Sequence, residues 1–338
     1  MSTVGIIVNP NAGKDIRRLV TPATHTSDVT KVGIVRRAIV AAAEAGAERI
    51  LIAPDTHHLG ERAADGLDVP AEIVDEPITG SRYDTIGAAR RFWKEQAGAV
   101  IALGGDGTSR DVALGWPDAP LIAISTGTNN VYPSAIDGTS AGAAAGYVAS
   151  GAVALELVGR RSKRIVVHID DTDSSVDDVA LVDLAFIDAD FVGARAVRDP
   201  HTIRAVVAAV ATPASTGLSA IAGRIHPIDR WESGGVLVRL GEGGRRVRVP
   251  LAPGSFTTMD VAEVRPLRDG EAVTISGRTI LAFDGERDRP VSPAGSVTCR
   301  VESSGPLLID VEKTLVLAAR DRRFDIDPVT SSGETHGH

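Results

Sequence analysis

The pentapeptide Gly104-Gly105-Asp106-Gly107-Thr108 is the segment of this sequence best suited to bind a phosphate group. It follows the apolar run Ala99–Leu103 and opens a helical pattern from Thr108 to Leu114, which predicts a turn between a strand and a helix. Backbone N–H groups and the positive dipole end coincide at a helix N-terminus, so anions bind there. The three glycines allow positive φ and let a phosphate approach the backbone without obstruction by a Cβ atom. Asp106 would then accept a proton, hold a metal or order a ribose hydroxyl; the alternative is an ordinary turn without ligand.

Two further polar loops also follow predicted strands. Asn9-Pro10-Asn11-Ala12-Gly13 comes after Val4–Val8, and Thr126-Gly127-Thr128-Asn129-Asn130 comes after Leu121–Ile124. In a parallel sheet such loops meet at the carboxyl edge, where ligands bind. Each loop alone is an ordinary turn, but together they predict one nucleotide site. The predicted nucleotide-binding residues are Asn9, Pro10, Gly13, Gly104, Gly105, Asp106, Gly107, Thr108, Thr126, Gly127, Thr128, Asn129 and Asn130.

Other motifs are excluded by their spacing. Gly13-Lys14 is followed by Asp15 and lacks the upstream glycine of a P-loop, and Arg110 occupies the last glycine position of a dinucleotide fingerprint. His57-His58 has no carboxylate partner at a ligand spacing, so an exposed helix start is the preferred interpretation. The acidic stretch that begins at Asp170 lacks the glycine and glutamate of a calcium loop and predicts a solvated hairpin.

The chain divides into two patterns. Residues 1–155 alternate short apolar runs with helical segments, which predicts an α/β, Rossmann-like domain with a parallel sheet. Residues 156–325 contain short alternating runs, among them separate strands over Gly234–Leu240 and Arg245–Leu251, that predict a β-rich antiparallel sandwich interrupted by one helical insertion over Pro200–Ala211. Residues 326–338 predict a flexible tail. The predicted first-domain helices are Val32–Ala45, Tyr83–Gln96 and Thr139–Ser150.

Composition bounds the partners of this 338-residue chain. Its 36 basic and 44 acidic residues leave a net charge of −8, which argues against a nucleic-acid partner. The single cysteine, Cys299, excludes an intrachain disulfide. There is no apolar run of about 18 residues and no signal-like start, so we expect a cytoplasmic protein without a membrane partner.

The motifs together resemble a kinase superfamily. Gly104–Thr108 and the Asn-Pro-x-x-Gly loop at Asn9 are similar to those of NAD kinases, diacylglycerol and sphingosine kinases and 6-phosphofructokinases. Thr212–Gly223 resembles the substrate loop of NAD kinases, and Ala282–Glu286 resembles a late Asp-Gly segment of NAD and lipid kinases. Over Val4–Val301 the chain most closely resembles the acetoin-catabolism X protein branch.

This resemblance implies a two-domain, NAD kinase-like fold with ATP and Mg²⁺ at an interdomain cleft. It places the catalytic aspartate at Asp106. The implied substrate-binding residues are Asp183, Thr212, Ser215, Thr216 and Gly217, and the candidate metal ligands are Asp106, Asp284 and Glu286.

One departure concerns the acceptor. Leu181–Asp188 carries Asp183 and Asp188 where NAD kinases have an Asn-Glu pair, and two carboxylates would repel a diphosphate unless a metal or Arg195 intervenes. We therefore expect an ATP-dependent kinase that phosphorylates a hydroxyl of a small metabolite, with a homodimer left open. The alternatives are NAD kinase proper and an inactive nucleotide-binding regulator of acetoin-type catabolism.

Overall fold

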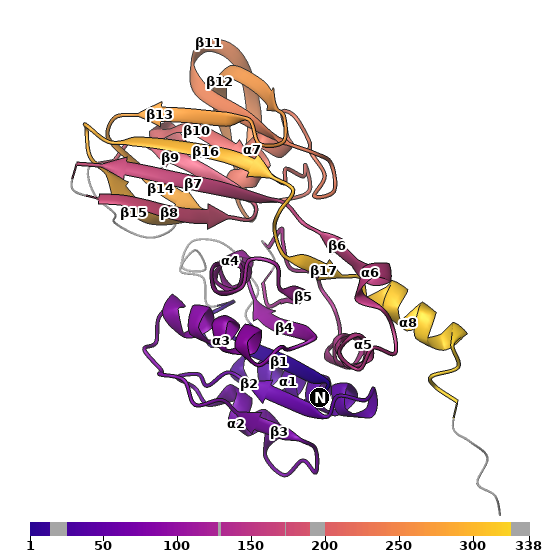
Figure 1. The fold of residues 1–338 in the computed structure, drawn as a ribbon. Helices are drawn as coiled ribbons and strands as arrows, with labels where there is room; N and C mark the ends of the chain where they lie inside the picture. Colours follow the sequence, from indigo (N-terminus) through magenta and orange to yellow (C-terminus); the bar gives the residue numbers. More distant parts are fainter. Residues whose placement is uncertain (14–25, 128–129, 173, 190–199, 326–338) are drawn as a thin grey trace, which may run out of the picture.

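Two stacked domains form the molecule, with helix α4 (Asp106–Gly115) between the first sheet and the second domain (Figure 1). The computed structural model describes residues 1–13, 26–127, 130–172, 174–189 and 200–325. The expected flexible tail, 326–338, lies outside the described residues. None of the helices in the described part of the chain is both long and apolar enough to cross a membrane.

The first domain is built on a seven-stranded sheet with the order β3-β2-β1-β4-β5-β17-β6. All neighbouring pairs are parallel except β17 with β6. Its strands are β1 (Thr3–Val8), β2 (Arg49–Ile52), β3 (Ala71–Ile73), β4 (Ala99–Gly104), β5 (Pro120–Ser125), β6 (Gly159–Arg161) and β17 (Leu307–Ile309). The order reverses between β1 and β4, so the loops that follow these two strands lie side by side at the carboxyl edge.

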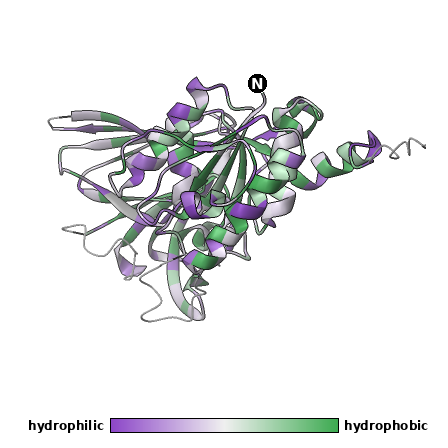
Figure 2. Cartoon of the chain, turned by 90° about the horizontal axis from the view of Figure 1, so that it is seen from below, coloured by the Kyte–Doolittle hydropathy of each residue, from purple (hydrophilic) through white to green (hydrophobic). Residues whose placement is uncertain are grey.

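Helices cover both faces of this sheet because its strands are apolar on both sides. One buried cluster packs α1 and α5 on the sheet, and a second packs α3 and α4 on the opposite face. Figure 2 shows the apolar strands enclosed by helices with polar outer surfaces. The remaining first-domain helices are α1 (Asp28–Glu44), α2 (Leu59–Ala64), α3 (Arg82–Lys94), α5 (Gly138–Ala149) and α6 (Leu155–Val158).

Helix α5 lies close to α1 because small residues line the contact. A Cβ atom at Gly138, Gly142 or Gly146 would lie within 2.5 Å of a backbone carbonyl oxygen of α1. The spacing of four residues places the three glycines on one helical face. Side-chain oxygens of Ser27 and Asp137 cap the N-termini of α1 and α5 by accepting backbone N–H bonds.

The second domain is an antiparallel sandwich, as its alternating sequence predicts. A six-stranded sheet (β12-β11-β10-β9-β14-β15) packs on a four-stranded sheet (β13-β16-β7-β8) across one apolar cluster. Its elements are β7 (Arg164–Asp171), β8 (Ser174–Ala180), β9 (Asp183–Ile187), β10 (Ile203–Ala208), α7 (Leu218–Gly223), β11 (Gly235–Ala252), β12 (Ser255–Leu267), β13 (Ala272–Ser276), β14 (Thr279–Phe283), β15 (Glu286–Val291) and β16 (Ser296–Glu302).

Two expectations about the second domain are wrong. Pro200–Ala211 is not a helical insertion: a single 3₁₀ turn, Pro200–Thr202, leads into β10, which pairs with β9 and β11. A short apolar run fits a buried strand as well as a buried helix, and here the sheet neighbours decide. The expected separate strands Gly234–Leu240 and Arg245–Leu251 form the single strand β11, with an irregular register between Leu240 and Arg245.

After the second domain the chain returns to the first domain. Strands β6 and β17 pair with each other, and β17 extends the first sheet beside β5. Helix α8 (Val311–Arg320) then joins the α1 and α5 side of the first-domain core. These three elements fall within residues 156–325, which were expected to form the second domain, whereas the chain crosses between the domains twice, near residues 162 and 305.

Candidate functional site

Three loops at the carboxyl edge of the first sheet converge, as their positions in the sequence predict. The Asn9 Nδ2 amide donates to Thr108 Oγ1 over 2.9 Å, and the Thr126 N–H donates to the Gly104 carbonyl over 3.1 Å. Asn130 Nδ2 donates to Ser125 Oγ at 2.8 Å, which turns its side chain toward Gly105. The predicted residues Thr128 and Asn129 lie outside the described residues.

The first turn of α4 offers backbone donors on an open surface. The Ser109 N–H makes the helix's first bond, to the Gly105 carbonyl, so the three preceding N–H groups have no partner within the helix. A Cβ atom at Gly107 would meet nothing within 4 Å. None of the three glycines adopts the positive φ that glycine allows, so they permit close approach only through their missing side chains.

A buried lysine and a close backbone approach fix the first of these loops. Lys31, fully buried on α1, donates from Nζ to the Asn9 carbonyl at 3.1 Å and to the Pro10 carbonyl at 2.7 Å. Gly13 has φ of +72°, and a Cβ there would lie 2.7 Å from the Thr126 carbonyl oxygen. Lys31 therefore holds the first loop by two hydrogen bonds, and the glycine at position 13 allows the loop to lie close to Thr126. Lys31 was not among the predicted site residues, although a lysine within the apolar stripe of a helix is the signal that could have indicated it.

The Asp106 carboxylate is held by the chain that follows β5. Asp106 Oδ1 accepts the Val131 N–H at 3.0 Å and the Tyr132 N–H at 2.8 Å. The pKa of Asp106 is raised to about 7, mainly by burial and in addition by the nearby Asp284 carboxylate. The backbone N–H bonds and Arg230 lower it, so the carboxyl group titrates near neutral pH.

Asp284 is the counterpart of Asp106 in the second domain. It follows β14 with φ of +49°, and its Oδ1 accepts the Leu181 N–H at 3.0 Å and the Val182 N–H at 2.8 Å. Burial raises the pKa of Asp284 to about 6, whereas Arg110 lowers it. Each domain therefore presents one carboxylate fixed by a pair of backbone donors.

Asp183 is the third carboxylate of this cluster. It is only 3% exposed, and its Oδ1 is buried without a hydrogen-bond partner. Burial, and then the carboxylates of Asp284 and Asp106, raise its pKa well above the usual value. Asp188, which the sequence analysis paired with Asp183, follows the far end of β9 and is exposed, so it does not belong to the cluster. Arg195 lies outside the described residues.

The predicted substrate loop lies beside Asp183. The Ser215 hydroxyl donates to the Thr212 carbonyl at 2.8 Å, and the Gly217 N–H donates to the Pro250 carbonyl at 3.0 Å. Thr216 Oγ1 is buried without a partner. The backbone N–H of Ser219, two residues after Gly217, hydrogen-bonds to the Asp183 carboxylate.

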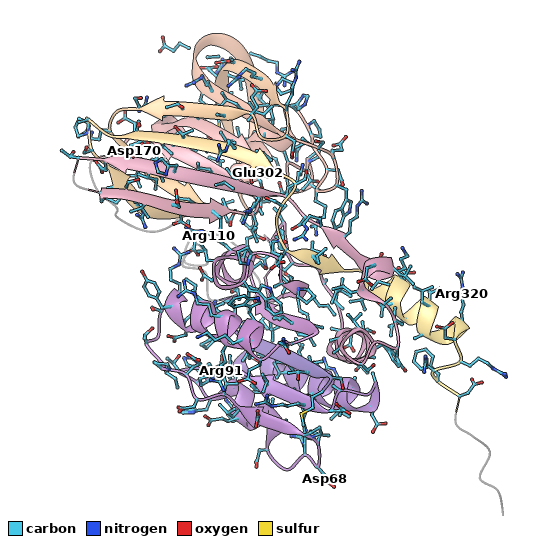
Figure 3. The ribbon with its side chains drawn as sticks, in the orientation of Figure 1. Asp68, Arg91, Arg110, Asp170, Glu302 and Arg320 are labelled. Carbon is cyan, nitrogen blue, oxygen red and sulfur yellow. The ribbon has the colours of Figure 1, made fainter. Side chains whose placement is uncertain are left out.

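Arg110 joins the two domains, and the sequence analysis missed this role. It extends from α4 to donate to the Val179 carbonyl at 2.6 Å and to Asp178 Oδ2 at 2.8 Å (Figure 3). Its guanidinium also stacks 4.1 Å from the centre of the Phe283 ring, beside Asp284. The ion pair is almost fully buried, so removing one partner would leave an uncompensated charge.

The described residues do not supply a metal cage by themselves. Within these ranges no three His, Cys, Asp or Glu side chains are grouped to hold a metal ion. Glu286, a candidate ligand from the sequence, begins β15 with an exposed side chain. Mg²⁺ is commonly bound through one or two carboxylates together with substrate phosphates, so nucleotide oxygens would have to complete its coordination.

The two-domain architecture and this site define a protein of the NAD kinase-like fold class. The structure matches a crystal structure of yeast NADH kinase complexed with NADH, with a TM-score of 0.54 and 14% identity over 99% of this chain and 90% of that one. Residues 4–150 match the family model of the ATP-NAD kinase N-terminal domain.

Residues 163–304 match the model of the acetoin catabolism protein X C-terminal domain. The chain is 36% identical over 331 residues to acetoin catabolism protein X of Cupriavidus necator, covering 94% of this chain and 92% of that protein. It is also 30% identical over 132 residues, 39% of this chain and 36% of the relative, to an uncharacterized protein of Archaeoglobus fulgidus. This chain belongs to the acetoin catabolism protein X family.

The raised pKa of Asp183 leads us to predict how the free energy of unfolding depends on pH. The pKa of Asp183 is higher in the folded state than in the unfolded state, so its protonated carboxyl group contributes to the free energy of unfolding. This contribution is complete below the unfolded-state pKa of about 4 and is lost as the pH rises through the folded-state pKa. We expect the free energy of unfolding of Asp183→Asn to fall less than that of the wild type between pH 5 and 8. Each unit of removed pKa shift corresponds to about 1.4 kcal/mol.

Denaturant unfolding over this pH range measures the effect. Asp188→Asn, which changes an exposed carboxylate five residues away, is the matched control and should follow the wild-type curve. If the free energies of unfolding of the wild type and Asp183→Asn changed in parallel with pH, the Asp183 carboxyl group would ionise in the folded state without loss of stability.

Proposed function

We propose that this protein is an ATP-dependent kinase that transfers a phosphoryl group to a hydroxyl of a small, weakly charged metabolite. One observation carries the proposal: the open N-terminus of α4 at Gly107 lies directly beside the Asp106 carboxylate, which faces Asp284 of the second domain. An anion-binding backbone and a proton acceptor of near-neutral pKa are the two components that phosphoryl transfer to an alcohol requires.

The chain's own groups divide these tasks. ATP with Mg²⁺ supplies the phosphoryl group and neutralises charge on it. The first-turn N–H groups of α4 orient the phosphate oxygens, and the Asn9 side chain fixes Thr108 in that turn. Asp106 accepts the proton of the acceptor hydroxyl, because burial brings its pKa to about 7.

The cluster of Asp106, Asp183 and Asp284 favours a neutral acceptor. Unlike the ATP phosphates, whose charge Mg²⁺ would neutralise, a phosphate or carboxylate on the acceptor would be repelled by these carboxyl groups and would leave Asp183 without a suitable partner. The name of the Cupriavidus necator relative, acetoin catabolism protein X, connects that protein with a small neutral hydroxyketone. This agrees with the proposed acceptor class.

The first prediction tests Asp106 itself. Asp106→Asn keeps an oxygen for the Val131 and Tyr132 N–H groups, so the fold and ATP binding should persist within about tenfold. Turnover should fall at least ~10²-fold because the proton acceptor is lost. The assay follows ATP consumption with a panel of neutral polyols and hydroxyketones.

The exposed Asp118, in the turn after α4, supplies the control Asp118→Asn, which should keep the wild-type rate. Unchanged turnover in Asp106→Asn would remove the catalytic role of Asp106. ATP binding without turnover across the whole panel would instead favour the regulator alternative.

The second prediction concerns the phosphate-binding turn. Gly107→Val introduces a side chain where the wild type has open space, so the fold should tolerate it while phosphate approach is blocked. We expect ATP affinity to fall at least about tenfold in calorimetric titration. Gly33→Val, in the middle of α1 and also without a close contact, is the control. Wild-type affinity in Gly107→Val would place the phosphates elsewhere.

The third prediction is that NAD is a poor acceptor. Buried polar groups that lack matching partners reject a substrate by orders of magnitude, and the diphosphate of NAD adds charge repulsion. With ATP, Mg²⁺ and millimolar NAD, we expect NADP formation far below the ~1–100 per second of ordinary kinases. NADP formation within that range would identify a NAD kinase and contradict the proposed acceptor class.

A further inference from the structure

Arg230 lies in a second-domain loop, yet it contacts the first-domain segment that holds Asp106. Its Nη1 donates to the Tyr132 carbonyl at 3.0 Å, and its Nη2 donates to the Val131 carbonyl. The guanidinium also lies 5.9 Å from the centre of the Tyr132 ring. Arg230 therefore fixes two successive peptide carbonyls with one planar fork.

The Val131 carbonyl and the Tyr132 N–H belong to the same peptide group. Arg230 bonds the oxygen end of this group, and Asp106 Oδ1 accepts its N–H end at 2.8 Å. A positive charge on the carbonyl oxygen polarises the peptide and strengthens its N–H as a donor. One peptide thus connects the Arg230 charge to the Asp106 carboxylate without direct contact between the two side chains.

The 229–234 loop that carries Arg230 is itself fixed. The buried Lys163 donates from Nζ to the Asp229 carbonyl at 2.8 Å and to the Gly234 carbonyl at 3.1 Å. Arg160 stacks 4.4 Å from the centre of the Trp231 ring. The Tyr132 hydroxyl hydrogen-bonds to Ser162 Oγ at 2.7 Å, which fixes the other end of the contact. Residues at the domain crossing therefore position both the loop that carries Arg230 and the Tyr132 side chain that Arg230 contacts.

From this geometry we infer that Arg230 is a positioning residue for Asp106. It holds and polarises the Val131–Tyr132 peptide, so that the first-domain carboxylate keeps its orientation only while the second-domain loop is in place. The catalytic consequence rests on the proposed role of Asp106 as proton acceptor. The positional consequence does not, and it can be measured without turnover.

The experiment compares backbone amide hydrogen exchange in the full-length wild type, Arg230→Gln and Arg230→Lys. Loss of the charged fork should speed exchange of the Val131 and Tyr132 amides by about tenfold or more in Arg230→Gln. Arg230→Lys keeps the charge but not the fork and should lie between the two. The amides of Leu181 and Val182, which bond Asp284, should not change. Arg224→Gln, an exposed arginine at the end of α7, is the matched control.

Kinetics separate a positioning role from a structural one. Arg230→Gln should lower kcat about tenfold or more while KM for ATP stays within about twofold, and it should add little in the Asp106→Asn background. Faster exchange at Val131 and Tyr132 with no turnover in any variant would support the inference and count against the kinase. Unchanged exchange at these amides, or faster exchange spread over both domains, would overturn the inference.

Discussion

The gathering of three carboxyl groups at the domain interface, Asp183 buried and Asp106 and Asp284 half-buried, is the constraint on which the rest of the site depends. The Asp284 carboxylate raises the pKa of Asp106, and both of these carboxylates raise the pKa of Asp183, so an uncompensated cluster of this kind would destabilise the fold. Paired backbone N–H groups fix the carboxylates of Asp106 and Asp284. Arginine charges act on the same two groups.

Two arginines, Arg110 and Arg230, also connect the two domains across the interface. Arg110 leaves α4 one turn after Asp106 and ends in a buried ion pair on β8, so α4 cannot shift without breaking it. Arg230 comes from the opposite direction, out of the second domain, and reaches the segment after β5. Both contacts therefore join the domains next to the carboxyl cluster, one through the helix that begins at Asp106 and one through the segment whose N–H groups bond Asp106.

The sequence predicted the features that depend on local pattern. Glycine-rich turns at the ends of apolar strands placed the three converging loops correctly, because parallel strands share a carboxyl edge. The resemblance identified the family, and it named Asp284 only as a candidate metal ligand. The strand β10 was missed because its short apolar run carries no periodicity that separates helix from strand. Arg230 could not be predicted, since it lies about 100 positions from the peptide that it binds. Asp188 was wrongly paired with Asp183 because the extended strand β9, five residues long, separates the two carboxyl groups, although they are close in the sequence.

The pH dependence of turnover tests the central claim that Asp106 is a half-buried proton acceptor. Only the ionised carboxylate accepts a proton, and burial brings the pKa of Asp106 to about 7. With a neutral acceptor, kcat/KM should rise between pH 5.5 and 8 with an apparent pKa near 7, which belongs to the coupled carboxyl groups. The residual rate of Asp106→Asn should lack this rise. A wild-type profile that is flat across this range, or that matches the profile of Asp106→Asn, would contradict the account.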